Sequence, residues 1–301
     1  METLIKIDSL TKDYGNGKGI FDLTLDIKKG QVCGLVGTNG SGKTTTLRHL
    51  MGFLKADKGS CSIAGLDCWK DENEIKRFVG YVPGDINFPD VGTGNDFLRL
   101  QAEYLHIEDR SYVNELIDIF KLDTSAPLRR MSKGMKQKTA LVAAFMGKPD
   151  ILLLDEPSTG LDPLMRDALI DLIKRHKKEG KTVFMSSHIF KELEDTCDVV
   201  AFIDNGKLIN VVDRKQYNPN MPKQYEISFA KAEEMQKFSE QTEFGIIHRS
   251  TQEPCLKIKV EVNKFNELFK ELSQYDIKGI KAIPYSLEWY YMEIVQKGGT
   301  I

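Results

Sequence analysis

The stretch GTNGSGKT, Gly37 to Thr44, constrains the fold more than any other feature of the chain. It follows the apolar run VCGLV and precedes a segment, Lys43 to Leu54, that we expect to be helical. A strand, this motif and a helix in succession are typical of a P-loop. Its glycines let the backbone curl so that the amides point at phosphate oxygens. The sequence therefore predicts an α/β fold built around a phosphate site.

The residue types in this loop predict how a nucleotide is held. We expect Lys43 to reach the β- and γ-phosphate oxygens and Thr44 to offer its hydroxyl to Mg²⁺. The predicted nucleotide-binding residues of the loop are Gly37, Thr38, Asn39, Gly40, Ser41, Gly42, Lys43, Thr44 and Thr45.

Two acids follow a second apolar run, ILLLDEP at residues 151 to 157. An aspartate that ends a buried strand beside a P-loop usually holds magnesium, which predicts Asp155 as a metal ligand. Glu156 can accept a proton from, or orient, a water that attacks the γ-phosphate. The alternative for Glu156 is an acid that faces solvent after a strand. Most P-loop kinases have no need of a base here, because their nucleophile arrives on a substrate, so the pair favours hydrolysis.

The order of hydrophobic patterns predicts the architecture of the first two thirds of the chain. Short β-rich runs come first, and the pattern turns helical from Phe88 to about Gly147. One helix is expected from Ser132 to Met146, with the serine as its cap. Buried strands and helices then alternate, and Asn205-Gly206 indicates a hairpin. We predict a P-loop NTPase core with an antiparallel β subdomain and a helical insertion at about 87–147.

The remainder of the chain predicts a second domain. The segment DRKQYNPNMPKQY, 213 to 225, has the composition of a linker. After it we expect strands at 224–229, 244–250, 255–262 and 277–283 and helices at 231–241 and 263–274, the order of a ferredoxin-like α+β unit. A last helix is expected at 286–296. The predicted domains are 1–215 and 216–301.

Composition excludes several classes of protein. A net charge of −2 without a long basic tract argues against an electrostatic grip on nucleic acid. Five cysteines without a CxxC pair favour reduced thiols. The N-terminus METLIKIDSL has no signal-peptide pattern, and runs such as ALVAAFMG are far shorter than a membrane helix. We expect no transmembrane segment, so a membrane role would come through a partner.

The segment MSKGMKQKTA, residues 131 to 140, is a second turn that attracts phosphate. Ser132 and Gly134 open a helix whose first turns carry lysines at 133, 136 and 138. Taken alone, it could equally be a capped surface helix with its lysines in solvent. With the other motifs, however, residues 1 to about 210 resemble the nucleotide-binding subunit of an ATP-binding cassette (ABC) transporter. The resemblance rests on the P-loop, MSKGMKQ, the Asp-Glu strand, STGLD at 158–162 and SSH ending in His188.

The resemblance implies that two such domains pair head to tail with ATP between them. Ser132 and Gly134 would then serve the γ-phosphate bound on a second copy, in a homodimer or with a related subunit. His188 resembles the histidine that contacts the γ-phosphate, although a lone histidine is often structural. Asp162 resembles an aspartate that communicates across the dimer, and a helix cap before Pro163 is an equally good account. Tyr14 resembles the aromatic residue that stacks on adenine. The alternative is that its ring simply packs against the protein.

Two positions depart from the family pattern. Gly84 stands where a glutamine usually touches the metal, and we expect water or Asp85 to fill its place. Lys133 replaces a common glycine, and its charge could reach phosphate or point to solvent. The family's membrane partner docks near residues 84–100, where Phe88 and Phe97 could serve that contact or belong to the core.

The resemblance also implies a role. The tail PYSLEWYYMEIV resembles that of exporter-type subunits that work with a separate integral permease, which implies a location at the cytoplasmic face of the membrane. The second domain could stabilise the dimer or regulate it. Our main hypothesis is thus an ATPase subunit that drives export. The alternatives are an ABC-family ATPase acting in translation or DNA repair, and a module that senses ATP without turnover.

Overall fold

The computed structural model describes residues 2–214, 223–283 and 286–296. The chain divides into two compact units, residues 1–214 and 215–301, and each is described by itself. Most of the predicted linker and two residues of the tail motif, Pro284 and Tyr285, lie outside the described residues, as do the side chains of 293–296.

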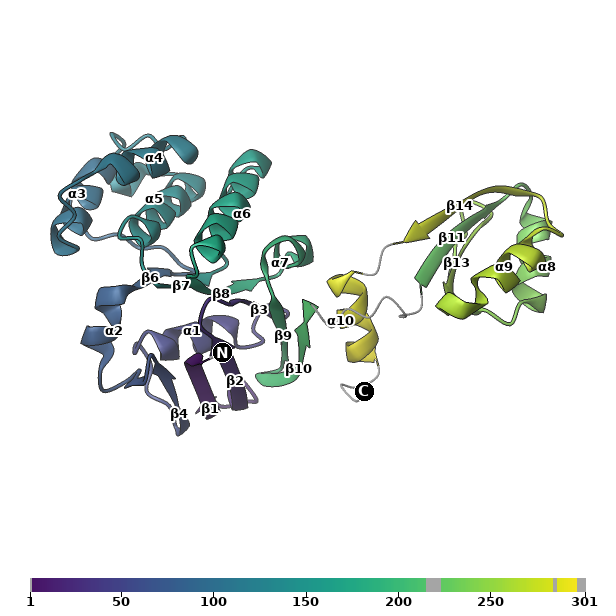
Figure 1. Cartoon of the computed structure of the whole chain (residues 1–301), viewed down its shortest axis with the longest axis horizontal. Helices are drawn as coiled ribbons and strands as arrows, with labels where there is room; N and C mark the ends of the chain where they lie inside the picture. Colours follow the sequence, from purple (N-terminus) through teal and green to yellow (C-terminus); the bar gives the residue numbers. More distant parts are fainter. Residues whose placement is uncertain (1, 215–222, 284–285, 297–301) are drawn as a thin grey trace. The chain divides into compact units, whose positions relative to one another are not determined.

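An antiparallel sheet forms one layer of the first unit (Figure 1). It contains β1 (Thr3–Asp13), β2 (Gly19–Lys28), β4 (Lys58–Ile63) and β5 (Leu66–Asp67), in the order β2-β1-β4-β5. In β2, buried and exposed residues alternate, as expected for a strand with one face on the core. This sheet is the predicted antiparallel β subdomain.

The second sheet has the order β10-β9-β3-β8-β7-β6. Its strands are β3 (Val32–Val36), β6 (Val79–Val82), β7 (Ile151–Asp155), β8 (Thr182–Ser187), β9 (Val199–Asp204) and β10 (Lys207–Asp213). All neighbouring strands are parallel except the β9–β10 hairpin, which turns at Asn205 and Gly206 with φ of 45° and 76°. Every residue of β3, β7 and β8 is buried, as in a sheet covered on both faces.

Helix α1 (Lys43–Leu50) lies between the two sheets (Figure 1). Its Leu47 and Leu50 share one buried cluster with residues of both sheets. The helix ends before the predicted Leu54 because Gly52 adopts φ +68°, and a Cβ there would stand 2.5 Å from the Cys68 carbonyl oxygen. A short helix, α2 (Glu72–Phe78), directly precedes β6.

The helical insertion contains α3 (Gly94–Tyr104), α4 (Ser111–Ile119), a short 3₁₀ turn (Leu128–Arg130) and α5 (Lys133–Phe145). Its prediction as helical is confirmed, although the first helix starts six residues later than Phe88. The Ser132 hydroxyl caps α5 by accepting a hydrogen bond from the Met135 amide at 3.2 Å. Helices α6 (Pro163–Lys178) and α7 (Phe190–Thr196) complete the unit.

The second unit has a four-stranded antiparallel sheet of order β12-β13-β11-β14. Its elements are β11 (Lys223–Phe229), α8 (Ala232–Gln241), β12 (Gly245–Arg249), β13 (Cys255–Val260), a 3₁₀ turn (Val262–Lys264), α9 (Phe265–Leu272) and β14 (Ile277–Ile283). This order confirms the ferredoxin-like prediction. Helix α10 (Leu287–Gln296) follows. None of the helices in the described ranges is long and apolar enough to span a bilayer.

Candidate functional site

The P-loop joins β3 to α1 and is tightly enclosed at two glycines. A Cβ at Gly37 would lie 2.1 Å from the Ile203 carbonyl oxygen, and one at Gly42 would lie 2.6 Å from Ile20 Cγ2. Gly42 also has φ +110°, a backbone conformation that residues with a side chain rarely adopt. These two positions therefore need glycine for steric reasons, and they fix the loop against β9 and β2.

The Lys43 side chain is buried within its own loop. Its ammonium group donates to the carbonyl oxygens of Gly37 at 2.8 Å and Thr38 at 3.1 Å. It also lies 3.5 Å from Oε1 of Glu156. The cation is thus placed between the loop that would hold a phosphate and the acid predicted to act on the attacking water.

Asp155 is fully buried at the end of β7, and one of its oxygens has no partner. Oδ1 accepts a hydrogen bond of 2.6 Å from the Ser186 hydroxyl, but Oδ2 contacts no donor among the described residues. A buried carboxylate oxygen without a donor is costly, and a metal ion satisfies it. Together with the Thr44 hydroxyl in the neighbouring cavity, this oxygen fits the oxygen-donor set that Mg²⁺ prefers.

Glu156 is held in an unusual backbone conformation beside His188. Its φ of +49° is uncommon for any residue except glycine, and its amide donates to the Ser186 hydroxyl at 2.9 Å. Its Oε2 lies 2.6 Å from Nδ1 of His188. Because an ionised carboxylate can only accept, this contact requires a hydrogen on Nδ1. With a hydrogen on Nδ1, a neutral form of the imidazole would have Nε2 as its acceptor. Strain of this kind is found at functional sites.

The cavity at the P-loop has a volume of about 610 Å³. Most of the predicted site residues meet here: Tyr14, Asn39, Gly40, Gly42, Lys43, Thr44, Thr45, Glu156 and His188 line it, with Gly84. Tyr14 leaves 53% of its surface exposed, as a residue available for stacking would. Lys18, Gly19 and Thr159 also line the cavity and were not predicted from the sequence. Thr159 lies in the quoted turn STGLD, so the motif could have indicated it.

A buried acid behind the cavity was also missed. Glu192 of α7 accepts hydrogen bonds from the hydroxyls of Ser158 at 2.9 Å and Ser187 at 3.0 Å, and Arg166 lies 3.1 Å from its other oxygen. Burial raises the pKa of Glu192, and the two serines partly offset that rise. Glu192 thus ties the turn after Glu156 to the end of β8, just before His188. Its sequence context, KELED, gave no signal of this because it is typical of an exposed helix.

Seven predicted residues are not among those that line the cavity of their own copy. Four of them belong to the P-loop or to the end of β7: Gly37, Thr38, Ser41 and Asp155. The other three are Ser132, Gly134 and Asp162. Asp162 caps α6 by accepting from the Met165 amide at 3.0 Å, as its local interpretation predicted. The start of α5 packs on the turn after Glu156: a Cβ at Gly134 would lie 2.7 Å from the Gly160 carbonyl oxygen, and Gln137 donates to the Pro157 carbonyl oxygen at 2.9 Å.

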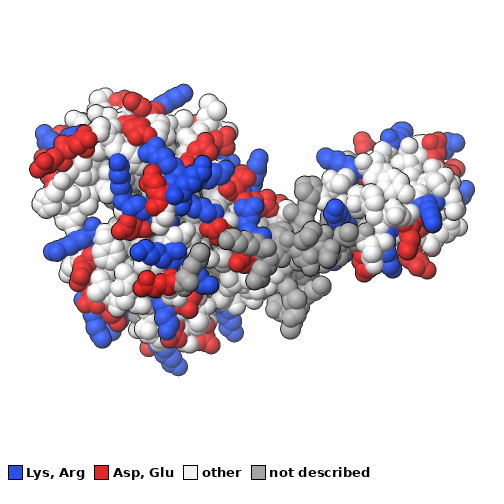
Figure 2. Space-filling model, in the orientation of Figure 1, with Lys and Arg blue, Asp and Glu red and all other residues white. Residues whose placement is uncertain are grey.

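The start of α5 has the character of an anion site. Its first turn has no acidic residue, and Lys133, Lys136 and Lys138 lie within its first two turns. Basic side chains oppose the helix dipole at this end, whereas a bound anion complements it. Figure 2 shows Lys and Arg gathered over the region of α5 and α6, while both signs mix over the rest of the visible face.

Known proteins are similar to this chain in sequence and fold. A family model described as "ABC transporter" matches residues 20–159. The bacitracin transport ATP-binding protein of Bacillus licheniformis is 32% identical over the whole length of both chains. The chain belongs to the ABC transporter family. The Nod factor export ATP-binding protein I of Ralstonia nicotianae is 31% identical over 68% of this chain and 66% of its own.

A solved ATP-binding subunit of an ABC transporter shows the same fold. It has a TM-score of 0.65 and 30% identity, and the match covers 71% of this chain and 91% of that one. As an ABC-family subunit, the chain binds and hydrolyses ATP. The cavity at the P-loop brings together most of the residues predicted for that reaction.

Proposed function

We propose that this ABC subunit hydrolyses ATP at a site completed by a second copy and thereby drives a separate integral membrane permease. The proposal of a shared site rests on one observation: within one copy, the residues of the P-loop cavity are separate from the start of α5. The P-loop cavity is lined by residues for the base and phosphates of ATP, whereas Ser132 and Gly134 are not among its lining residues. A head-to-tail pair would bring the basic start of α5 to the γ-phosphate on the partner.

The roles in hydrolysis follow from the contacts of each side chain. Tyr14 would stack on adenine, the loop Gly37 to Thr45 would enclose the phosphates, and Lys43 would neutralise charge on the β- and γ-oxygens. Glu156 would accept the proton of the attacking water, and His188, held at 2.6 Å, would orient that acid. Asp155 and Thr44 would hold Mg²⁺, which would neutralise charge that develops on the phosphate oxygens.

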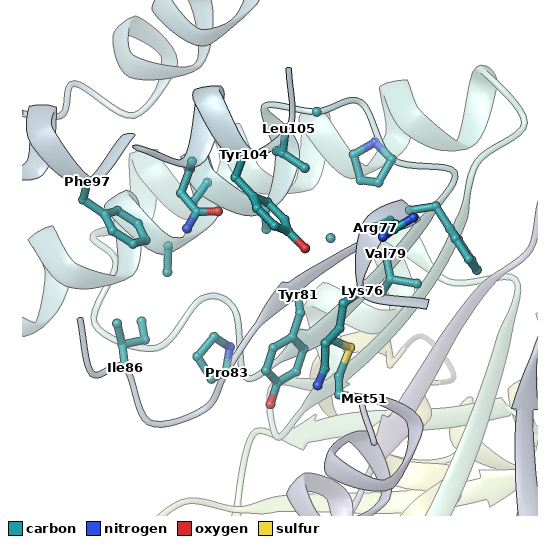
Figure 3. A pocket seen from close by; sticks show the side chains of 18 of the residues that line it. Met51, Lys76, Arg77, Val79, Tyr81, Pro83, Ile86, Phe97, Tyr104 and Leu105 are labelled. Atoms are coloured by element: carbon teal, nitrogen blue, oxygen red, sulfur yellow. The ribbon is translucent and has the colours of Figure 1, made fainter. Parts of the chain in front are cut away.

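The second large cavity of this unit supports a membrane partner. It is a groove of about 630 Å³ between α2 and β6 on one side and α3 and α5 on the other. Its lining is mostly apolar and aromatic, and Figure 3 shows Phe97, Tyr104 and Tyr81 along the hollow. Tyr104 is 60% exposed and Phe53 is 49% exposed. Phe88 packs on Phe97 with ring centroids 4.7 Å apart, so these two residues serve both the packing and the groove.

The charges on this groove define the chemistry of the segment that would dock there. Arg77 is exposed and has no ion pair with any residue that the structure describes, while Lys76 is paired with Glu72 at 2.5 Å. The acid Asp150 is paired with Lys181. We therefore expect an amphipathic helix of the permease that buries an apolar side chain between the aromatic rings and places a carboxylate at Arg77.

The direction of transport is proposed from the relatives and the tail. One relative is named for the export of Nod factor and another for the transport of bacitracin. These names, with the exporter-type tail, support export of a cargo chosen by the permease. The subunit would then lie at the cytoplasmic face of the membrane, bound through the groove.

A mixing experiment tests the shared site. Glu156→Gln should bind ATP without turnover, and Gly134→Asp should repel the γ-phosphate on its partner. Each variant alone should be inactive. A mixture of the two should recover ATPase activity, because the mixed dimer has one site with an intact Glu156 opposite an intact Gly134. If the mixture stays inactive while each variant still binds ATP, the shared site is wrong.

Isolation from membranes tests the partner. The chain with an affinity tag should retain one integral protein after detergent extraction, and ATP hydrolysis should change on its removal. Purification without any integral protein would instead favour an ABC-family ATPase that does not act in transport.

A further inference from the structure

Gly84 lies against the buried acid that we propose as a metal ligand. It follows β6 and lines the nucleotide cavity, where the sequence analysis noted the absence of a glutamine. A Cβ built at Gly84 would lie 2.7 Å from Oδ2 of Asp155 and 3.0 Å from its Cγ. Real Cβ atoms do not come this close to another atom, so a side chain at residue 84 would have to displace the carboxylate.

The carboxylate has little freedom to move away. Asp155 is fully buried, and Oδ1 is held by the Ser186 hydroxyl at 2.6 Å. The same hydroxyl accepts from the Glu156 amide at 2.9 Å, and the β7–β8 register pairs Asp155 directly with Ser186. Rotating the carboxylate would break this chain of hydrogen bonds. Oδ2, the oxygen without a donor, is therefore held toward Gly84.

We infer that Gly84 is a positioning residue that keeps Oδ2 of Asp155 open to the metal. The absence of a side chain is then a requirement of the site and not a lost ligand. Water would supply the remaining ligands, since Mg²⁺ usually keeps several waters in protein sites. A glutamine at residue 84 would weaken metal binding in this chain, although it is the residue that the family pattern favours.

The test measures metal affinity, which does not depend on turnover. In a Glu156→Gln background with ATP present, free Mn²⁺ is followed by electron paramagnetic resonance. Gly84→Ala and Gly84→Gln should weaken Mn²⁺ binding about tenfold or more, the range found when a supporting residue of a metal site is changed. ATP affinity in the absence of metal should not change. Gly279→Ala is the matched control, because a Cβ there meets no atom within 4 Å.

A double variant separates this effect from a general loss of structure. Removing the Ser186 hydroxyl frees the carboxylate, so the loss caused by Gly84→Ala should be smaller in a Ser186→Ala background. If Gly84→Ala fails to fold, its combination with Ser186→Ala should restore folding. Equal penalties in the two backgrounds, failure of both to fold, or tighter Mn²⁺ binding by Gly84→Gln would overturn the inference.

The inference rests on the proposed role of Asp155, and the two can fail separately. Asp155→Asn should itself weaken Mn²⁺ binding. If it does not, the proposed metal ligand is wrong. If it does, and the Gly84 variants bind Mn²⁺ as the parent does, only the role of Gly84 is wrong.

Discussion

The two large cavities of the first unit have nearly the same volume and opposite chemistry. The nucleotide cavity, about 610 Å³, is lined by glycines, hydroxyls and charged groups, whereas the groove proposed for docking, about 630 Å³, is mostly apolar and aromatic. The segment after β6 borders both, because Gly84 lines the first and Pro83 and Ile86 line the second. A displacement of this short segment in one cavity would therefore also move residues that line the other.

The two cavities place different requirements on their residues. In the nucleotide cavity, single atoms have fixed tasks: Oδ2 of Asp155 has no donor, and Oε2 of Glu156 lies 2.6 Å from His188. In the groove, binding would come from surface area shared among many side chains. Single substitutions should therefore reduce ATP turnover strongly in the first cavity and reduce permease binding only moderately in the second.

The largest effect is expected for Glu156→Gln. The amide keeps the shape of the side chain but cannot accept a proton, so ATP turnover should fall by about 100-fold or more. ATP affinity should not fall, because Lys43 and the loop still hold the phosphates. Steady-state phosphate release and binding of a fluorescent ATP analogue measure the two quantities. Turnover equal to that of the parent would show that Glu156 is not the base.

A smaller effect is expected for Tyr104→Ala in the groove. Truncation of a central aromatic residue typically weakens a protein interface by more than 1 kcal/mol, so permease binding should fall about tenfold. Basal ATPase activity should not change. Leu164→Ala is the control, because Leu164 is 70% exposed on α6 and does not line the groove. Equal retention of both variants on membranes would argue against the groove as the docking site.

The nucleotide cavity could be predicted from the sequence because backbone geometry imposes its motif. Gly37 and Gly42 are required by close contacts, and Lys43 and Thr44 follow at fixed spacing. The role of Ser186 could not be predicted in this way. It reaches Asp155 only through the register between β7 and β8, and residues 31 positions apart carry no local sign of that register. The separation of Ser132 from the cavity was implied only by the family resemblance.

The groove shows the opposite limit. Its lining comes from α2, β6, α3, α5 and several connecting segments, and apolar residues at helical spacing look the same whether they face a core or a groove. The sequence therefore left Phe88 and Phe97 open between the two. The fold of the second unit was predictable because the sequence patterns of its six main elements are distinct. No sequence motif in this unit indicates a function.

Charge at the edge of the groove should have a weaker effect than its aromatic rings. Arg77→Glu should slow permease binding a few-fold at low salt, because an exposed charge acts mainly on the rate of association. The difference from the parent should shrink as salt is added. Lys29→Glu, an exposed lysine that does not line the groove, controls for the change in net charge. A salt-independent difference would mean that Arg77 acts through packing.

The smallest expected effect is on the free energy of unfolding. It concerns two buried histidines, one in the helix behind each cavity. His49 lies in α1 behind the P-loop, with Nδ1 2.8 Å from the Thr45 carbonyl oxygen. His176 lies in α6 behind α5, with Nδ1 3.0 Å from the Leu172 carbonyl oxygen and its ring on Phe145. Burial lowers the pKa of both histidines from the ordinary value of 6.5. Each histidine is then protonated more readily in the unfolded chain than in the folded one.

Because the unfolded state binds more protons below pH 6.5, the free energy of unfolding should fall as the pH drops from 6.5 toward the folded pKa values. His176→Leu should make this fall shallower, and so should His49→Leu. Urea unfolding between neutral pH and about pH 5.5 measures the slope. If both variants flatten it additively, the helix behind each cavity carries its own acid sensitivity. An unchanged slope in His176→Leu would mean that its imidazole stays as easily protonated in the fold as in the unfolded chain, despite its burial against Phe145.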